Sequence, residues 1–469
     1  MKVLFAVHGY PPELVGGTEN TTQALARGVV RAVGEAVVVA GSLDWQGGYR
    51  VSEATDTDPV TGRSIAVYRI HRDDLYFDHW HKSVSPRVAG DFRAILERER
   101  PDVVHVQHWL RLTRDLVAVA ARVGIPAAVT LHDLWTTCPI TFRVRSDSGE
   151  FCESPMAANP CLGCAGRVPP RTPWVDVGQS HMLLAERRSD VVRELTLARV
   201  VAVPSRAHAR SVAEFLGLDA DALELRVVPP GRDLDLPRRT RADLPGADRP
   251  LVLTTWGHHS ALKGTDLLLD AIGRLPEPRR VELHVLGESV TPEYEADLRR
   301  RSADLRVHFH GAFAGAPALA EHPGADAHLM VSGTRARESW GMVVDEALRL
   351  GLPCVLPNSG AFVERAEGAA WAVLYEAGDP SSLADGLQAV LEDPDRLVRM
   401  RAGLPEPEAV VPSLEAHVAT WSSIYEEIVP LGAPEPAEPD WWLDRMRTAF
   451  EADWDASLQQ RPAAEVGLE

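Results

Sequence analysis

Short apolar runs rich in β-branched residues alternate with helical patterns along most of this chain, and this alternation constrains the fold more than any other feature. The first run, Val3 to Val7, leads through a loop rich in glycine and proline into an amphipathic stretch that ends near Ala32. Strands that alternate with helices form parallel sheets covered by helices on both faces. The first half therefore predicts a doubly wound α/β lobe. Its expected strands are 3–7, 36–40, 103–106, 127–131 and 199–203.

The same alternation begins again after a stretch rich in proline and arginine, residues 229–250. A length of 469 residues also predicts two or three domains. We expect Rossmann-like lobes in 1–230 and 231–412, helices in 413–460 and a disordered tail in 461–469. Ligands of such sheets bind beyond the carboxyl ends of the strands, so two facing lobes predict a central cleft. The expected strands of the second lobe are 251–255, 281–286, 307–310, 328–332 and 354–357, and its expected helices are 265–274, 292–301 and 341–351.

Composition excludes several classes of protein. Hydrophobic residues make up 45% and charged residues 25%, which is typical of a globular chain. The formal charge of -18 would repel nucleic acid and anionic membranes, so we expect neither as a partner. No apolar run is long enough for a transmembrane segment, and residues 1–7 lack the apolar region of a signal peptide. These features predict a cytoplasmic protein.

Two glutamates eight residues apart, Glu338 and Glu346, flank an expected helix start at Gly341. The free backbone N–H groups and the dipole of a helix start favour a bound anion. A carboxylate on each side of such an anion can accept hydrogen bonds from two sugar rings. The alternative interpretation is a pair of solvated glutamates on a surface helix.

A glycine pair follows the first expected strand of the first lobe, and a lysine follows the first expected strand of the second lobe. Lys263 comes shortly after the strand 251–255 and directly before a helix, where its ammonium can point into the cleft. In so acidic a chain, a phosphate-bearing ligand requires such a local positive charge. Gly16 and Gly17 lie in the loop after the first strand, where the absence of side chains lets the backbone approach a ligand.

Several further motifs, in a characteristic order, accompany these residues over roughly residues 1–400. With them the chain resembles the family 4 glycosyltransferases, which are retaining enzymes with the GT-B fold. The fold class implied is α/β, with two Rossmann-like lobes that face a central cleft. The motifs are Tyr10-Pro11-Pro12, Gly16-Gly17-Thr18-Glu19, Pro101-Asp102-Val103-Val104-His105, His132-Asp133, Val203-Pro204-Ser205, Pro230-Gly231-Arg232-Asp233, Lys263-Gly264, Gly287-Glu288, the two glutamates and Gly351-Leu352-Pro353.

The resemblance implies an acceptor lobe first and a donor lobe second, with a nucleotide-diphosphate sugar as donor and a hydroxyl-bearing acceptor. It implies that Lys263 neutralises the diphosphate, that Glu338 contacts the donor sugar and that Glu346 binds the ribose hydroxyls. It also implies transfer with retention and without a catalytic metal. The catalytic residues implied are His132, Lys263 and Glu338, and the donor-binding residues implied are Gly16, Gly17, His258, Lys263, Glu338, Trp340, Gly341 and Glu346.

The chain departs from the family pattern near the diphosphate. His258 stands where the family usually has arginine, so we expect that contact to be weaker or to come from Arg335 or Arg337. Trp340 replaces a usual phenylalanine. Two alternatives stay open: a sugar-nucleotide epimerase or hydrolase of the same fold, and a carbohydrate-binding protein without turnover. A nicotinamide oxidoreductase is disfavoured because no Gly-x-Gly-x-x-Gly follows the first strand.

Four of the five cysteines, Cys138, Cys152, Cys161 and Cys164, fall in one segment without hydrophobic periodicity. Four thiolates form a tetrahedral site that suits structural zinc. A metal would also order a loop that apolar packing cannot order. We therefore predict a structural zinc in the loop 138–164, with an iron-sulfur site and free or disulfide-linked thiols as the alternatives.

Overall fold

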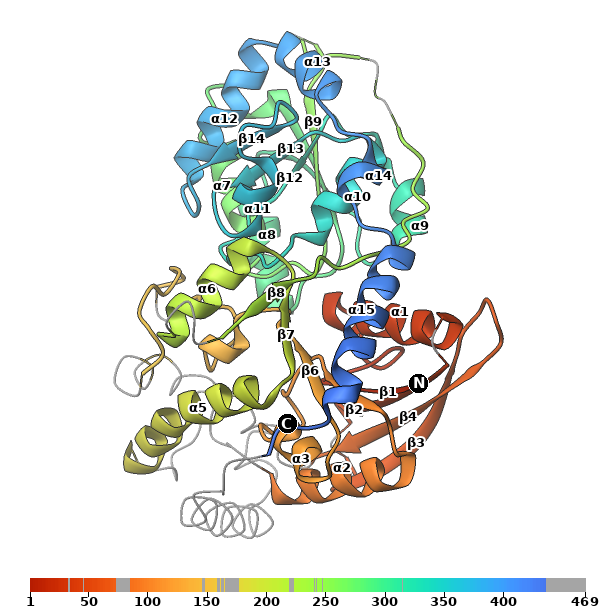
Figure 1. The fold of residues 1–469 in the computed structure, drawn as a ribbon. Coiled ribbons are helices and arrows are strands. Elements are labelled where there is room, and N and C mark those ends of the chain that lie inside the picture. Colours follow the sequence, from red (N-terminus) through yellow and green to blue (C-terminus); the bar gives the residue numbers. More distant parts are fainter. Residues whose placement is uncertain are drawn as a thin grey trace.

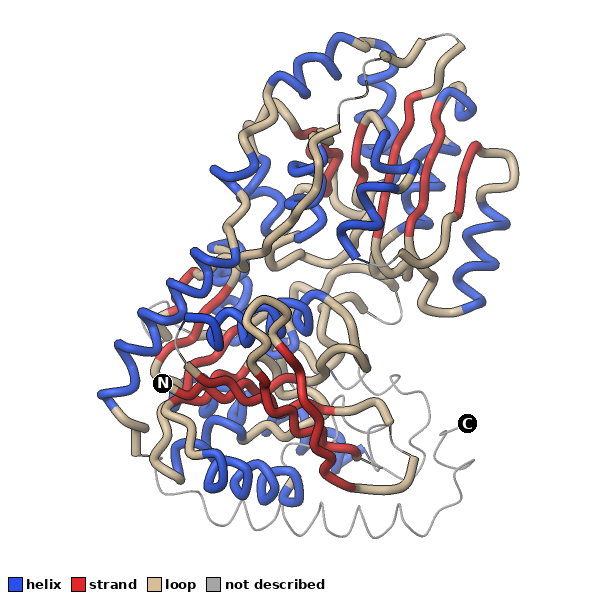
Figure 2. Tube along the Cα trace, turned by 90° about the vertical axis from the view of Figure 1, so that its right-hand side faces the viewer, coloured by secondary structure: helices blue, strands red, loops and turns tan. Residues whose placement is uncertain are grey.

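The computed structural model describes residues 1–435 except 33, 45, 73–84, 146–147, 158–160, 162–163, 165–176, 219–222, 240, 242, 247 and 314. Two lobes, each built around one sheet with helices on both faces, stand one above the other (Figures 1 and 2). The predicted fold class, two doubly wound α/β lobes, is therefore confirmed. Of the helices expected in 413–460, the part beyond residue 435 lies outside the described residues, as does the tail 461–469.

The first lobe holds an eight-stranded sheet in the order β3-β4-β2-β1-β5-β6-β7-β8. All neighbours are parallel except β3 and β4, which form an antiparallel pair at one edge. The five expected strands are present, whereas β3, β4 and β8 were not expected. β3 is a mostly exposed strand, and its sequence therefore contains no apolar run that would have indicated it. The strands are β1 (Lys2–Val7), β2 (Glu35–Gly41), β3 (Arg50–Thr57), β4 (Ser64–His71), β5 (Val103–Val106), β6 (Ala127–Thr130), β7 (Val200–Val203) and β8 (Leu225–Val227).

Helices of the first lobe connect these strands and carry its apolar side chains into two core clusters, one on each face of the sheet. The central strands β1, β2 and β5 are buried along nearly their whole length, as expected for strands covered on both sides. The helices are α1 (Gly17–Ala32), α2 (Pro86–Glu99), α3 (Leu116–Arg122), the short 3-10 helix η2 (Trp135–Thr137), α5 (Val177–Leu197) and α6 (Arg206–Leu216).

The second lobe holds a six-stranded, wholly parallel sheet in the order β11-β10-β9-β12-β13-β14. Its strands are β9 (Leu251–Trp256), β10 (Val281–Leu286), β11 (Arg306–Phe309), β12 (Leu329–Val331), β13 (Cys354–Pro357) and β14 (Ala372–Tyr375). Its helices are α7 (Thr265–Gly273), η3 (Pro278–Arg280), α8 (Pro292–Arg301), α9 (Gly315–Glu321), η4 (Pro323–Asp326), α10 (Met342–Leu350), α11 (Ala361–Ala366), α12 (Pro380–Glu392), α13 (Asp395–Ala402) and α14 (Pro407–Val410).

One further helix, α15 (Leu414–Ile428), leaves the second lobe and lies along α1 of the first, before the short η5 (Val429–Leu431) (Figure 1). Its side chains Val418, Trp421 and Tyr425 share a core cluster with Phe5 of β1. The two lobes are thus joined by packing as well as by the chain. None of the described helices combines the length and the apolar composition that a membrane crossing requires.

Candidate active site between the lobes

A cavity of about 390 Å³ lies between the lobes, at the carboxyl ends of the second-lobe strands. The first lobe contributes the loop before α1 and the start of that helix, and the second lobe contributes the loops that follow β9, β10 and β12. Gly17 approaches the second lobe closely, since a Cβ atom there would lie 2.4 Å from Cε of Met342. Seven residues predicted from the sequence line this cavity: Gly16, Gly17, His258, Lys263, Glu338, Gly341 and Glu346.

Lys263 and Glu338 form an ion pair at one side of the cavity. Lys263 lies in the turn between β9 and α7, and Glu338 lies in the loop between β12 and α10. The Lys263 ammonium donates to Oε1 of Glu338 at 2.8 Å. An ammonium has three protons to donate, and the Lys263 side chain is 46% exposed. The pair therefore leaves N–H groups of the ammonium free to donate to a ligand in the cavity.

Glu346 is held by two residues that the sequence reasoning did not assign to the site. Trp256, the last residue of β9, donates its indole N–H to Oε2 of Glu346 at 2.6 Å. A nitrogen of the Arg232 guanidinium lies 2.9 Å from Oε1 in an ion pair. Both residues line the cavity. The motif that contains Arg232 was the signal available for it, whereas Trp256 carried no motif.

The expectation that Arg335 or Arg337 replaces the missing arginine contact is not supported. The Arg335 guanidinium donates two hydrogen bonds to the Asp266 carboxylate, at 2.9 and 2.8 Å. Arg337 pairs with Glu153 of the first lobe. Neither arginine lines the cavity, whereas Arg232 does. The second cation of the cavity thus comes from the segment that links the lobes.

Trp340 also lies outside the cavity lining. Its indole N–H donates to Oδ2 of Asp345 at 2.8 Å, and the Arg365 guanidinium lies over its ring, 4.3 Å from the centroid. Asp345 is fully buried at the start of α10. Trp340 therefore supports α10 from the side away from the cavity.

The carboxyl ends of β1, β5 and β6 bring together a chain of histidines and carboxylates in the first lobe. His8 lies 2.8 Å from Oε1 of Glu19, and its ring centroid lies 4.4 Å from that of His108. His108 lies 3.4 Å from Oδ2 of Asp133. Burial alone would raise the pKa of Asp133, but the neighbouring His108 lowers it to about 2. Burial lowers the pKa of His8, and the charge of His108 adds to this effect.

His132 follows β6 and lies beside this chain, but it does not line the cavity. Its Nε2 shares a hydrogen bond of 2.5 Å with Oε1 of Gln107. Gln107 in turn bonds the buried His105, which reaches the Tyr425 hydroxyl of α15 at 2.7 Å. Burial lowers the pKa of His132 to about 3, so its imidazole is neutral near pH 7.

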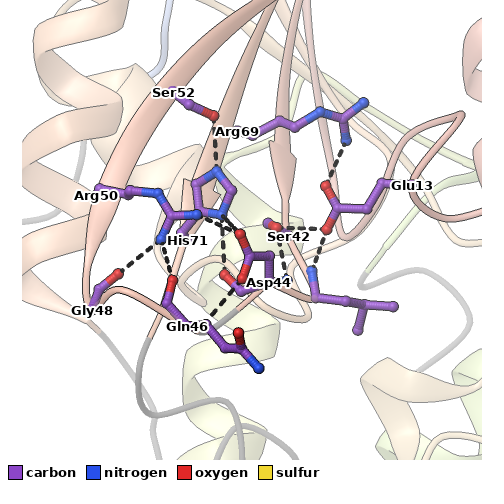
Figure 3. Close-up of polar contacts among 10 residues, drawn as sticks. Glu13, Ser42, Asp44, Gln46, Gly48, Arg50, Ser52, Arg69 and His71 are labelled. Carbon is purple, nitrogen blue, oxygen red and sulfur yellow. Dashed lines mark hydrogen bonds and ion pairs between the residues drawn. The ribbon is translucent and has the colours of Figure 1, made fainter.

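A polar cluster at the edge of the first lobe braces the loop that leads to the glycine pair (Figure 3). Glu13 accepts hydrogen bonds from the Ser42 hydroxyl and the Leu43 N–H, both at 2.5 Å, and pairs with Arg69 at 3.3 Å. Arg69 also donates to the backbone oxygen of Tyr10 at 3.0 Å. This end of the loop is thereby fixed to β2 and β4.

The zinc site in the loop 138–164 stays a prediction, although Cys161 lies near enough to Cys138, Cys152 and Cys164 to interact with them electrostatically. Among the residues that the structure describes, the cysteines form no group of three ligand atoms within 4.8 Å of one another. Arg143 braces the loop, because its guanidinium donates to the backbone oxygens of Thr137 at 2.6 Å and Cys152 at 3.0 Å. Burial raises the pKa of Cys138 to about 11, which keeps that thiol protonated.

Two family models cover most of the chain. Residues 15–236 match glycosyltransferase family 4, and residues 249–393 match the glycosyl transferases group 1. The facing lobes and the cavity between them agree with the GT-B architecture that these families share. The chain belongs to the family 4 glycosyltransferases with the GT-B fold.

Individual relatives and solved structures agree with this assignment. A D-inositol 3-phosphate glycosyltransferase of Catenulispora acidiphila is 29% identical over 346 residues, which cover 69% of this chain and 72% of that protein. A glycogen synthase of Mycobacterium tuberculosis is 25% identical over 84% of this chain and 87% of its own. Sucrose-phosphate synthase from Thermosynechococcus elongatus has a TM-score of 0.65 at 18% identity, covering 92% of this chain and 100% of that one. HepE of Anabaena in complex with UDP has a TM-score of 0.59 at 18% identity, covering 91% and 100%.

Proposed function

We propose that this glycosyltransferase moves a sugar from a nucleotide-diphosphate sugar to a hydroxyl acceptor with retention of the anomeric configuration. One observation carries the proposal: Lys263 and Arg232, each paired with a glutamate, converge on the interlobe cavity beside the start of α1. Two cations with two carboxylates match a ligand that is anionic at its diphosphate and rich in hydroxyls elsewhere. The structures of HepE with UDP and with UDP-glucose are consistent with such a donor.

The diphosphate is assigned to the side of the cavity that holds Lys263 and the start of α1. The helix dipole and the free N–H groups at Gly17 favour a negative charge there. In a chain of formal charge -18, these local groups must outweigh a repulsive background. His258 lines the same cavity and adds a donor when its ring nitrogen faces the ligand.

The two glutamates are assigned different parts of the donor. The carboxylate of Glu346 is held in place by Trp256 and Arg232, and its free lone pairs can accept hydrogen bonds from the ribose hydroxyls. Glu338 is assigned to the hydroxyls of the transferred sugar. When the donor binds, its diphosphate competes with Glu338 for the Lys263 ammonium, which frees the carboxylate for the sugar.

Retention follows, in this proposal, from attack on the same face that the diphosphate leaves. Lys263 stabilises the negative charge that develops on the leaving diphosphate, and such placed charges supply much of the rate enhancement of enzymes. The histidine chain of the first lobe is assigned to the acceptor side. His132, neutral near pH 7, can accept or donate a hydrogen bond to a sugar hydroxyl there.

The proposal is tested with a panel of nucleotide sugars. Thermal stabilisation of the protein by a donor, followed by donor consumption in the presence of polyol and oligosaccharide acceptors, is the expected result. An inositol phosphate is included among the acceptors, since several relatives are named for it. The anomeric configuration of the product, read by NMR, tests retention. A product with inverted configuration contradicts retention. If no nucleotide sugar of the panel stabilises the protein, the proposed donor class is contradicted.

A further inference from the structure

Three ligand-bearing side chains gather on one face of the second-lobe sheet, outside the cavity lining. Glu282 and His284 are two residues apart on β10, so their side chains share a face. His308 lies on the edge strand β11, directly opposite His284 in the parallel register. The sheet therefore places two imidazoles and a carboxylate side by side.

The distances among these side chains are those of a metal-ligand set. Oε1 of Glu282 lies 3.1 Å from Nε2 of His284 and 3.4 Å from Nε2 of His308. In a tetrahedral zinc site, bonds of about 2.0–2.1 Å place neighbouring ligand atoms ~3.3–3.4 Å apart. The three ligand atoms all lie within 4.8 Å of one another. The two distances to Glu282 thus match the edges of such a tetrahedron, and the two histidine nitrogens lie within 4.8 Å of each other.

Two more histidines stand behind the first. Nδ1 of His284 shares a hydrogen bond of 3.0 Å with Nε2 of His310, and the two rings stack at an interplanar angle of 6°. The ring of His322 meets that of His310 edge-on, with 4.3 Å between centroids. A histidine that binds a metal usually donates its other N–H to a neighbouring acceptor, which fixes the tautomer. His310 supplies that acceptor for His284.

We propose that Glu282, His284 and His308 bind a divalent transition-metal ion of the zinc type, with His310 as the orienting partner of His284. Two imidazoles and a carboxylate favour zinc over magnesium or calcium, which prefer oxygen ligands. The His308 side chain is 51% exposed, so solvent reaches the site and water supplies the fourth ligand. The nearby Arg241 does not stand as an isolated positive charge, because its guanidinium bonds Asp243 at 2.7 and 3.1 Å.

The position of the site gives the metal a structural role. β11 is an edge strand held by β10 alone, and the metal joins the two strands through their side chains. Just beyond them, the Gly287 N–H donates to the Gly311 oxygen at 2.7 Å, and Gly287 and Phe313 line the donor cavity. The metal therefore steadies the ends of two strands that carry part of the cavity wall.

The experiment uses the untagged full chain, stripped with a chelator and titrated with Zn²⁺ by calorimetry and with Co²⁺ by absorption spectroscopy. We expect one ion per chain at this site, with cobalt bands of a nitrogen and oxygen ligand set. His308→Ala should abolish this binding without loss of fold, because His308 lies at the surface. Glu282→Gln, which keeps the size of the side chain, should weaken it at least tenfold.

A second variant separates this site from the cysteine loop. The double variant Cys161→Ser/Cys164→Ser should leave the binding at this site unchanged. The cobalt spectrum of this double variant should lack the charge-transfer band of a thiolate ligand. Equal binding by the wild type and His308→Ala would overturn the proposal, as would the absence of metal binding by the wild type. These readouts do not involve nucleotide sugars, so their result is independent of the proposed transferase activity.

Discussion

At the scale of single residues, the candidate site is defined by two glutamates that are not equivalent. Glu346 lies in the second turn of α10 and is fixed by Trp256 and Arg232. Glu338 precedes the helix, and its carboxylate accepts a hydrogen bond from Lys263. In the proposed function, the first is a preformed acceptor, whereas the second exchanges its partner when the donor binds. The eight-residue spacing identified both residues, but only the structure distinguishes their environments.

Glu346→Ala and Glu338→Ala should therefore affect different kinetic constants. Loss of the proposed hydrogen bonds from Glu346 to the ribose should raise the donor KM about 10- to 100-fold, which corresponds to the roughly 1.5–3 kcal/mol of charged hydrogen bonds. Removing Glu338 should lower kcat about 100-fold with a smaller change in KM, because its contact forms at the reacting sugar. Steady-state kinetics with the donor found in the panel measures both. Glu295→Ala, an exposed glutamate of α8, is the matched control. Unchanged constants in both site variants would contradict the assignment.

The stability of the protein should depend on pH through buried neutral histidines such as His208 of α6. Burial lowers the pKa of His208 to about 4 from its ordinary value of 6.5. Below pH 6.5 His208 is protonated in the unfolded chain but stays neutral in the folded chain, so the free energy of unfolding falls as the pH falls toward 4. When the pH falls from about 7 to about 5, the free energy of unfolding of the wild type should fall by about 2 kcal/mol more than that of His208→Gln.

Urea unfolding of both proteins at the two pH values measures this difference. The change in the free energy of unfolding between the two pH values is compared for the wild type and His208→Gln. This comparison removes the contributions of other groups, such as the carboxylates, which the two proteins share. Identical pH dependence of the two proteins would show that His208 does not carry this proton linkage.

At the scale of elements, the site depends on how α10 begins. Gly341 caps the helix with a φ of 80°, a left-handed conformation that favours glycine. A Cβ atom there would lie 2.3 Å from a ring carbon of Phe362, on the next helix α11. The helix start can thus approach its neighbour only without a side chain. The sequence predicted this boundary from the glycine, and the structure adds the packing contact.

Gly341→Ala should destabilise the protein through both effects. The left-handed backbone costs about 1–2 kcal/mol for alanine, and the contact with Phe362 adds about 1–3 kcal/mol of overpacking. Gly368→Ala is the matched control, because Gly368 has a φ of 73° with no atom within 4 Å of an added Cβ. Gly368→Ala should lose stability only through the left-handed backbone conformation. Thermal or urea unfolding measures the difference, and equal losses in both variants would exclude the steric contact with Phe362.

At the scale of the whole molecule, the first lobe is completed by a helix from the far end of the described chain. Trp421 of α15 is 1% exposed and lies in the core cluster that includes Phe5. Its ring centroid lies 4.0 Å from that of His105, which also bonds the Tyr425 hydroxyl. α15 therefore connects the core of the first lobe to the polar network that ends at His132.

Trp421→Ala should lower the free energy of unfolding of the first lobe by about 3–5 kcal/mol, the usual loss for a large buried aromatic side chain. Donor affinity should change much less, because most donor contacts proposed here lie in the second lobe. Urea unfolding and donor titration measure the two effects. Leu431→Ala, next to α15 but 58% exposed, is the control. A loss no larger than that of the control would contradict the role of α15 in this core.

The sequence by itself determined the alternation of strands and helices, the two lobes and seven residues of the cavity lining. Those features depend on local signals: apolar periodicity, glycine at turns and short motifs at strand ends. It missed the strands β3, β4, β8 and β14, of which β3 is mostly exposed and carries no apolar run. It also missed Trp256, which reads as the end of an ordinary strand.

The tertiary structure decided what depends on the approach of distant segments. It placed Arg232 rather than Arg335 or Arg337 at the cavity, and it placed Trp340 behind α10. It placed the Arg143 guanidinium against the backbone oxygens of Thr137 and Cys152 in the loop 138–164. It also set His284 opposite His308 across two strands. Side-chain direction and strand register settle these contacts, and both follow from packing that no local pattern in the sequence records.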